Sequence, residues 1–465
     1  MILERFGLSR IHFIGIGGAG MSGIAEVLLN YSLEISGCDQ ASSEATGRLA
    51  KLGAELHEGH SADHLEGVDL VVISSAVPED NPELVAARER GITVVRRAEM
   101  LAELMRLKMG VALAGTHGKT TTTSMVGAVL TDAGLDPTVI VGGRVRAYGT
   151  GARVGRGDFL VAEADEFDRS FLRLHPVLAA ITNIDADHMD TYRNLDEIQD
   201  AFVEFANRVP FFGRAIVCLD DPNVQRIIGR IDRRIVTYGV SAQAELQAYD
   251  LRPVEGGSRF RVRTVDEGPL GEVTLPMPGV HNVRNALVAV AVGMALQLDF
   301  DVIAASLERF SGVSRRFERL GTWLGATVVD DYAHHPTEVA ATLDAARQAY
   351  PDGRVHVVFQ PHLFTRTRDL AADFGGALLG ADQALVLEIY PARERPIPGV
   401  TGEMVVDEAR SRGHRNTAFT TWEDAVARLE DTVRPGDLVM TLGAGDITRF
   451  GRHLVAGPDG EEAPR

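Results

Sequence analysis

A glycine-rich turn near the middle of the first half of the chain constrains the fold more than any other feature. Residues 111–125 read VALAGTHGKTTTTSM, so an apolar strand leads into Gly115-Thr-His-Gly118-Lys119-Thr120 and then into a helix with an apolar face. Backbone amides and the helix dipole at such a turn hold phosphate oxygens, a lysine adds a point charge, and a hydroxyl can bind magnesium. We therefore predict a phosphate loop inside an α/β domain.

The turn departs from the common pattern G-x-x-x-x-G-K-[ST], because Leu113 stands near the position of the first glycine. The alternative is a structural turn that carries a solvated lysine. The strand before the turn, the helix after it and the run of threonines argue against that alternative. Lys119 is also one of only three lysines in the chain.

A second glycine-rich turn follows the first predicted strand, residues 11–15. Gly15, Gly17 and Gly20 fit G-x-G-x-x-G, in which glycines let the backbone approach a diphosphate at a helix N-terminus. The next predicted strand ends close to Asp39, about where a ribose-binding carboxylate is expected. Three interpretations stay open on these residues alone: NAD(P), another diphosphate ligand, or a purely structural turn. The broken apolar stretch and its flanks argue against a secretion signal.

The two turns lie about 100 residues apart, and each opens its own α/β unit. A dehydrogenase needs only the turn at residues 15–20, and a motor ATPase needs only the phosphate loop at residues 115–120. The pair favours an enzyme that joins a nucleotide-linked substrate to ATP chemistry.

Composition excludes several classes of protein. The formal net charge of −18 disfavours binding to nucleic acid but does not exclude a locally basic pocket for a small anion. No apolar run is long enough to predict a membrane span. The only two cysteines, Cys38 and Cys218, cannot form a disulfide framework, and we expect reduced, buried thiols and a cytoplasmic protein.

Acidic residues follow two further predicted strands. Glu163 ends the strand at 157–163, and the strand at 177–182 leads into the segment 183–190, which contains His188. Carboxylates at the ends of parallel strands point to the same sheet edge as the phosphate loop and suit Mg²⁺ that bridges ATP phosphates. A histidine is less expected as a magnesium ligand.

The remaining chain predicts a long apolar helix and then a third α/β unit. Asn282 and Asn285 lie one turn apart near the start of that helix, either as a cap with a polar edge or as amides that recognise a base. Beyond Ser314, a strand precedes the loop Asp331–His334, and further strands are expected at 355–359, 385–389 and 437–441. The pair His334–His335 has no cysteine nearby, which disfavours zinc there.

Taken together, these motifs resemble those of the Mur ligase family over nearly the whole chain. The matching segments, in order, are GIGGAGMSGIAE, GTHGKTTT, EADEFDRSF, NIDADHMDTY, HNVRNA, RRFE, DDYAHHPTEV, QPH-x-x-TRT and LGAGDI. The resemblance implies three α/β domains: a Rossmann-like UDP-sugar-binding domain at 1–108, a P-loop ATPase-type domain at 109–313, and a Rossmann-like amino-acid-binding domain at 314–465.

The resemblance also implies a role for individual residues. The UDP-sugar would be bound by Gly15, Gly17, Gly18, Gly20, Asp39, Ser74 and Ser75. ATP would be bound by Gly115, Thr116, His117, Gly118, Lys119, Thr120, Thr121, Asn282, Asn285, Arg316 and Asp331. Magnesium would be held by Thr120, Glu163 and His188, and the catalytic group would comprise Lys119, Glu163, His188 and Arg316. His335, His362 and Arg366 would meet the substrate or the incoming amino acid; Leu363 replaces an arginine found in some members.

The implied reaction joins UDP-N-acetylmuramate to L-alanine, with ATP and two Mg²⁺ ions, through an acyl phosphate on the route to peptidoglycan. No lysine follows Lys119, so the carbamoylated lysine of several other Mur ligases is absent. The expected enzyme is a cytoplasmic monomer or homodimer with no nucleic-acid partner. The alternatives are a ligase that attaches a ready-made tripeptide, an NAD-dependent oxidoreductase, and a nucleotide switch without ligase chemistry.

Overall fold

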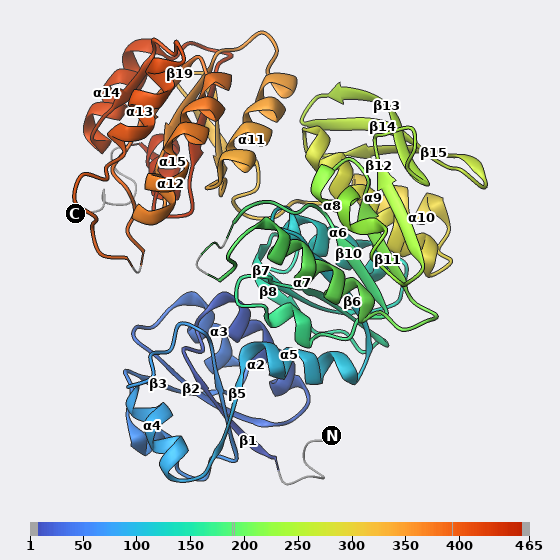
Figure 1. Cartoon of the computed structure of the whole chain (residues 1–465). Helices are drawn as coiled ribbons and strands as arrows, with labels where there is room; N and C mark the ends of the chain where they lie inside the picture. Colours follow the sequence, from blue (N-terminus) through green and yellow to red (C-terminus); the bar gives the residue numbers. More distant parts are fainter. Residues whose placement is uncertain (1–7, 188, 190, 393, 458–465) are drawn as a thin grey trace. The chain divides into compact units, whose positions relative to one another are not determined.

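The computed structural model describes residues 8–187, 189, 191–392 and 394–457, which form three α/β sheets (Figure 1). Contacts divide the chain into two compact units. The first comprises 1–251, 260–274 and 283–313, and the second comprises 252–259, 275–282 and 314–465. The first two sheets lie essentially in the first unit, and the third sheet lies in the second unit. The domain boundaries at 108 and 313 remain a prediction.

The first sheet has the strand order β3-β2-β1-β4-β5, and all of its pairings are parallel. Its strands are β1 (Arg10–Ile14), β2 (Glu34–Asp39), β3 (Glu55–Glu58), β4 (Leu70–Ile73) and β5 (Thr93–Arg96). Its helices are α2 (Ala19–Asn30), α3 (Glu44–Lys51), η1 (Ala62–Leu65), α4 (Pro82–Glu89) and α5 (Arg97–Arg106). The strand order reverses between β1 and β4. Ligands bind such a sheet at the carboxyl ends of the two strands where the order reverses.

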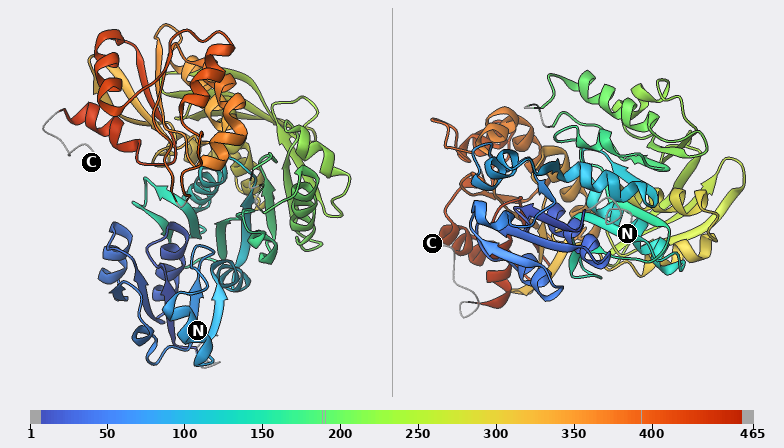
Figure 2. Two further views of the ribbon diagram at one scale, coloured as in Figure 1. Left: turned by 60° about the vertical axis from the view of Figure 1, so that its left-hand side comes forward. Right: turned by 90° about the horizontal axis from the view of Figure 1, so that it is seen from below.

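Side chains of β1 alternate between the two faces of this sheet. Ile11 and Phe13 join a core that includes residues of α2 and α5, whereas Ile14 packs with Val71 and with Leu84 of α4. Two-residue periodicity therefore gives the sheet two separate apolar layers. Further views show helices along both faces (Figure 2).

The second sheet has ten strands in the order β15-β14-β13-β12-β11-β10-β6-β9-β7-β8. They are β6 (Met109–Ala114), β7 (Thr138–Val145), β8 (Thr150–Arg153), β9 (Phe159–Glu163), β10 (Leu178–Ile181), β11 (Arg214–Cys218), β12 (Ile235–Gly239), β13 (Leu246–Val254), β14 (Gly257–Thr264) and β15 (Gly268–Leu275). The helices are α6 (Lys119–Asp132), η2 (Ser170–Arg173), α7 (Leu195–Asn207), α8 (Pro222–Ile228), α9 (Val280–Ala295) and α10 (Phe300–Glu308). Strand β6 lies between β10 and β9, parallel to both, so their carboxyl ends surround the phosphate loop.

The third sheet has the order β16-β17-β21-β18-β19-β20, and only the edge pair β16–β17 is antiparallel among its named pairings. Its strands are β16 (Glu318–Trp323), β17 (Ala326–Asp331), β18 (Val355–Phe359), β19 (Gln383–Val386), β20 (Thr417–Phe419) and β21 (Leu438–Leu442). Its helices are α11 (Pro336–Ala349), α12 (Phe364–Ala377), η3 (Leu378–Gly380), α13 (Glu403–Ser411), α14 (Trp422–Thr432) and α15 (Thr448–Ala456). Val329 and Val328 of β17 join different apolar clusters, one on each face.

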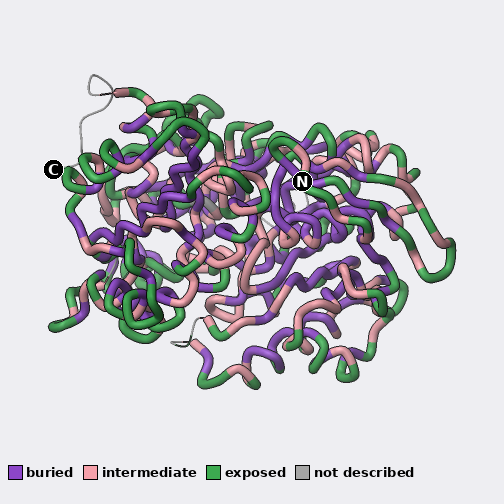
Figure 3. Tube along the Cα trace, turned by 90° about the horizontal axis from the view of Figure 1, so that it is seen from above, coloured by how far each residue is buried: buried purple, intermediate pink, exposed green. Residues whose placement is uncertain are grey.

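Burial follows this layering, because central strands such as β6, β10, β18 and β21 are buried almost throughout. Figure 3 shows the buried and exposed stretches along the trace. Cys38 and Cys218 are free and buried, as the sequence predicts. Within the described part of the chain, every helix is too short or too polar to cross a bilayer.

Candidate active site

The phosphate loop joins β6 to α6, and two of its glycines are required by backbone geometry. Gly115 has φ +133° and Gly118 has φ +83°, a left-handed region that other residues rarely adopt. A Cβ on Gly115 would lie 2.0 Å from Thr182 Oγ1, and one on Gly118 would lie 2.8 Å from Asn285 Oδ1. The loop therefore packs tightly against the end of β10 and against α9.

Lys119 is the first residue of α6, and its ammonium folds back over the loop. Its Nζ donates to the carbonyl oxygens of Gly115 at 2.8 Å and Thr116 at 3.2 Å, and to both carboxylate oxygens of Glu166 at 2.8 and 3.0 Å. Burial alone would lower the pKa of Lys119, but the carboxylates of Glu166 and Asp165 outweigh it and raise that pKa. The lysine is therefore a permanent positive charge at the loop.

The segment after β10 supports the loop from the other side. Asn183 accepts from the His117 amide at 2.8 Å and donates to the His117 carbonyl at 3.0 Å. Asp185 lies 3.2 Å from His117 Nε2, and its own amide donates to Thr116 Oγ1 at 2.9 Å. These contacts fix the shape of the loop.

Glu163 is the last residue of β9, in register with Leu113 of β6. Its carboxylate accepts from the Thr120 hydroxyl and from the Gly142 amide, while burial raises its pKa. The other oxygen, Oε1, is buried and makes no hydrogen bond within the described structure. An inaccessible carboxylate oxygen without a donor is costly unless something else occupies it.

The first sheet carries a cavity of about 390 Å³ at the carboxyl ends of β1 and β4. Of the residues expected there, Gly15, Gly17, Gly18, Asp39 and Ser74 line it, as do Ala76, Val77, Pro78, His60 and Asn81. Asp39 accepts from the Gly17 amide at 2.8 Å, so the predicted acid holds the glycine turn itself. Gly20 and Ser75 are not among the lining residues.

Arg97, the first residue of α5, connects this cavity's glycine turn with the acidic segment after β9. A Cβ on Gly20 would lie 2.8 Å from Arg97 Nη1, so the glycine makes room for the guanidinium. Arg97 Nη2 also lies 3.9 Å from Asp165 Oδ2.

In the second unit, the loop before β16 and the end of β17 are joined through Asp331. Its carboxylate accepts from the amides of Phe317 at 2.7 Å and Ala333 at 2.8 Å, and burial raises its pKa to about 6. Arg316 lies over the Tyr332 ring, 5.2 Å from its centroid, and 3.7 Å from Glu338.

Histidines gather beside these residues. His335 caps α11 by accepting from the Thr337 amide at 3.4 Å. The His362 ring stacks on Tyr390 at 5.9 Å between centroids and meets His334 edge-on at 5.9 Å. Burial lowers the pKa of His334 to about 4, with the positive charge of Arg366 acting in the same direction.

Comparisons with known proteins agree over almost the whole chain, residues 10–445 in the family profiles. Sequence profiles described as "Mur ligase family, catalytic domain", "Mur ligase middle domain" and "Mur ligase, glutamate ligase domain" match residues 10–109, 113–293 and 315–445. The chain belongs to the Mur ligase family. The three Mur ligase profiles fall one on each of the three sheets, which confirms the predicted fold class.

Individual Mur ligases are also similar over almost their full lengths. The UDP-N-acetylmuramate–L-alanine ligase of Desulfatibacillum aliphaticivorans is 51% identical over 96% of this chain and 98% of its own. The enzyme of the same name from Salinibacter ruber is 52% identical over 96% of this chain and 94% of its own. The crystal structure of UDP-N-acetylmuramate–alanine ligase from Thermotoga maritima has a TM-score of 0.80 and 30% identity, covering 96% of this chain and 98% of that one.

The magnesium ion that Mur ligase chemistry implies fits the residues present at the phosphate loop. Thr120 and Glu163 offer a hydroxyl and a carboxylate in mutual contact, and the undonated Glu163 Oε1 is the type of hard oxygen ligand that Mg²⁺ prefers. His188, the third predicted ligand, lies outside the described residues.

Three contacts at the Mur ligase site were not predicted from the sequence. Glu166 pairs with Lys119, Asn183 holds His117, and Arg97 reaches the acidic segment. Glu166 and Asn183 do fall within the motifs EADEFDRSF and NIDADHMDTY, but only the folded sheet edge reveals their partners. Asn282 donates to the Pro278 carbonyl at 2.8 Å, whereas Asn285 lies against the loop.

Proposed function

We propose that this chain joins the carboxylate of UDP-N-acetylmuramate to the amine of L-alanine and converts ATP to ADP and phosphate. The observation that carries the proposal is 51% identity to an enzyme of that name over 96% of the chain, together with a phosphate loop whose lysine is held charged. Relatives of this name disfavour the tripeptide-attaching alternative, and membership of a ligase family disfavours the oxidoreductase and the switch.

The chemistry proceeds in two displacements. An oxygen of the muramate carboxylate attacks the γ-phosphorus of ATP, and the bond to the β,γ-bridging oxygen breaks to release ADP. The alanine nitrogen then attacks the carbonyl carbon of the acyl phosphate, phosphate leaves, and the nitrogen loses a proton. Phosphorylation is needed because a carboxylate oxygen is otherwise a poor leaving group.

The first step brings together two anions in a protein with a net charge of −18, so local positive charge is required. The phosphate loop supplies backbone amides at the start of α6, and Lys119 supplies a fixed cation for the ATP phosphates. Bound magnesium would neutralise phosphate charge from the position of Thr120 and Glu163. The glycine turn beside Asp39 would hold the UDP diphosphate, as its cavity lining supports.

Further roles belong to the proposal by resemblance. Asn282, Asn285 and Asp331 would contact the adenosine of ATP, and Arg316 its γ-phosphate. His335, His362 and Arg366 would meet the substrate or alanine. We further propose a cytoplasmic enzyme, supported by two free cysteines, that exists as a monomer or homodimer and uses two Mg²⁺ ions.

Phosphate release with UDP-N-acetylmuramate, ATP and each of the twenty amino acids tests the reaction. We expect release that depends on alanine and on the sugar nucleotide. Lys119→Ala should abolish turnover but change the affinity for UDP-N-acetylmuramate by less than about twofold, and Lys51→Ala, on the exposed end of α3, should resemble the parent. Phosphate release without an amino acid, or an unchanged rate in Lys119→Ala, would contradict the proposal.

A further inference from the structure

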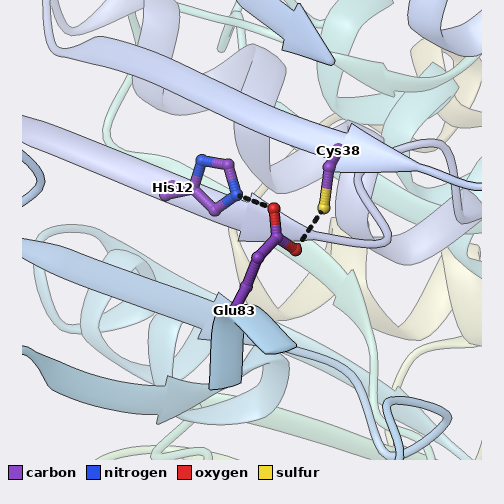
Figure 4. Close-up of side chains that lie close together, drawn as sticks. All are labelled: His12, Cys38 and Glu83. Carbon is purple, nitrogen blue, oxygen red and sulfur yellow. Dashed lines mark hydrogen bonds and ion pairs between the residues drawn. The ribbon is translucent and has the colours of Figure 1, made fainter. Parts of the chain in front are cut away.

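A polar cluster lies inside the first α/β domain, on the face of its sheet that α4 covers. His12 comes from β1, Cys38 from β2 and Glu83 from α4, and their side chains point toward one another (Figure 4). All three residues are fully buried, at 0% exposure. Cys38 belongs to the apolar layer that also contains Ile14 and Leu84, so the polar His12 and Glu83 side chains lie beside apolar neighbours.

Contacts within the cluster are short. Glu83 Oε2 lies 2.7 Å from Cys38 Sγ, and Glu83 Oε1 lies 3.5 Å from His12 Nε2. The potential ligand atoms of all three residues lie within 4.8 Å of one another. His12 Nε2 is buried and makes no hydrogen bond, while Nδ1 of the same ring is bound to Ser36 Oγ at 2.9 Å. The cluster thus contains a buried nitrogen, Nε2 of His12, that faces the Glu83 carboxylate but makes no hydrogen bond.

Two further histidines contact the cluster from the segment after β3: His60 from the loop and His64 from η1. His60 Nδ1 lies 3.0 Å from Glu83 Oε2 and 3.1 Å from Cys38 Sγ, and His64 Nδ1 lies 2.6 Å from Glu83 Oε1. Their side chains are 23% and 16% exposed, so the cluster has a route to solvent. His60 also lines the cavity beside the glycine turn.

The proposed ligase reaction uses none of these five side chains, and burying a carboxylate among them opposes folding unless its charge is compensated. Burial favours the protonated form of Glu83, but its hydrogen-bonded partners outweigh this effect and lower its pKa to about 2. Burial and the Glu83 carboxylate raise the pKa of Cys38, so the thiol carries its proton when nothing displaces it.

We propose that His12, Cys38, Glu83 and His60 form a binding site for one divalent metal ion of the zinc type. Thiolate sulfur, imidazole nitrogen and carboxylate oxygen are the donors that Zn²⁺ takes in fourfold coordination. With Zn–S of about 2.3 Å and Zn–N of about 2.0 Å, neighbouring donors stand roughly 3.5 Å apart, so the observed cluster needs only a small expansion. The metal replaces the thiol proton of Cys38, which is released to solvent.

Such an ion would join β1, β2, α4 and the segment after β3 at one point. Cys38 immediately precedes Asp39, the residue that holds the Gly17 amide, and His60 faces the cavity directly. A metal ion at this site would therefore stabilise the segment that holds the diphosphate turn, and it is separate from the magnesium position at Glu163.

Cobalt substitution of the full-length protein tests the site. The protein, without a histidine tag, is stripped with a chelator, saturated with Mg²⁺ and titrated with Co²⁺ and then with Zn²⁺. We expect one equivalent of Co²⁺ with thiolate-to-cobalt absorption, which Zn²⁺ removes. Cys38→Ser should lose that absorption, and Cys218→Ser, which alters the only other thiol, should retain it. His60→Ala should weaken Zn²⁺ binding by roughly 10–100-fold.

Absence of thiolate-to-cobalt absorption in the parent, its persistence in Cys38→Ser, or its loss in a folded Cys218→Ser would overturn the proposal. Circular dichroism verifies that each variant folds. If Cys38→Ser does not fold, anomalous diffraction at the zinc edge from crystals of the parent grown with Zn²⁺ decides the matter. A peak between Cys38 Sγ and His12 Nε2 supports the site, and a map without that peak overturns it.

Discussion

Nζ of Lys119 lies 2.8 Å from a carboxylate oxygen of Glu166, a buried residue four positions before the short helix η2 (Ser170–Arg173). The pair joins the phosphate loop to the acidic segment after β9. In this arrangement the charge that ATP phosphates would bind already has a protein partner.

Glu166→Gln is expected to destabilise the first unit, because Lys119 loses its anionic partner in a largely buried position. The free energy of unfolding should fall by about 3 kcal/mol, and saturating Mg²⁺–ATP should recover part of the loss by supplying phosphate charge. Thermal unfolding followed by circular dichroism measures both effects. Glu204→Gln, which alters an exposed pair with Arg208, is the control and should cost less than about 1 kcal/mol. Equal stability of parent and Glu166→Gln would show that the pair contributes nothing.

Gly118→Ala should impair ATP binding, because the new Cβ meets Asn285 Oδ1 at 2.8 Å and the backbone holds φ +83°. We expect a loss of roughly 1–3 kcal/mol in stability and an increase of at least about tenfold in the KM for ATP. Steady-state kinetics and thermal unfolding measure these changes. Gly47→Ala is the matched control, since Gly47 lies within helix α3 with open space around it and should gain about 0.5–1 kcal/mol. A normal KM for ATP in Gly118→Ala would contradict the loop geometry.

Glu163→Gln should weaken the dependence on magnesium, because the amide keeps the size of the side chain but removes the charge of its buried oxygen. The apparent affinity for Mg²⁺ should fall by at least about tenfold and kcat by roughly 100-fold. A titration of phosphate release with Mg²⁺ at saturating substrates separates the two effects. Glu99→Gln, at the surface pair with Arg173, should leave the titration unchanged. Unaltered Mg²⁺ affinity in Glu163→Gln would place the metal elsewhere.

The second unit should lose stability in acid through His334, whose pKa is lowered by burial to about 4. The unfolded imidazole has a pKa of about 6.5, so between these values the unfolded state binds the extra proton. The contribution of neutral His334 is thus fully present above pH 6.5 and is lost as the pH falls toward 4, a change of about 3 kcal/mol.

His334→Gln removes this titration, so the difference in unfolding free energy between parent and variant should change by about 3 kcal/mol from pH 6.5 to pH 4. Denaturant unfolding at several pH values measures it. Asp331, with a pKa raised to about 6, acts in the opposite direction and is present in both proteins, so its effect cancels. Parallel pH profiles for the two proteins would refute the assignment.

Features that are encoded by consecutive residues could be predicted from the sequence. The phosphate loop, the glycine turn of β1 and the acid at the end of β9 each combine an apolar strand with the residue types that follow it. The Lys119–Glu166 pair could not be predicted, since 47 positions separate the two residues and either of the neighbouring acids could have faced the lysine. The cluster of His12, Cys38 and Glu83 could not be predicted for the same reason: the three residues are far apart in the sequence, and only the fold brings them together.

The contacts of Lys119 have a consequence for nucleotide exchange. The loop carbonyl of Gly115 and the Glu166 carboxylate already accept hydrogen bonds from the Lys119 ammonium. If Lys119 binds ATP phosphates as proposed, an arriving triphosphate would have to displace Glu166, and Glu166 would pair with Lys119 again when the nucleotide leaves. On that proposal, Glu166 would set the residence time of the nucleotide without contacting it.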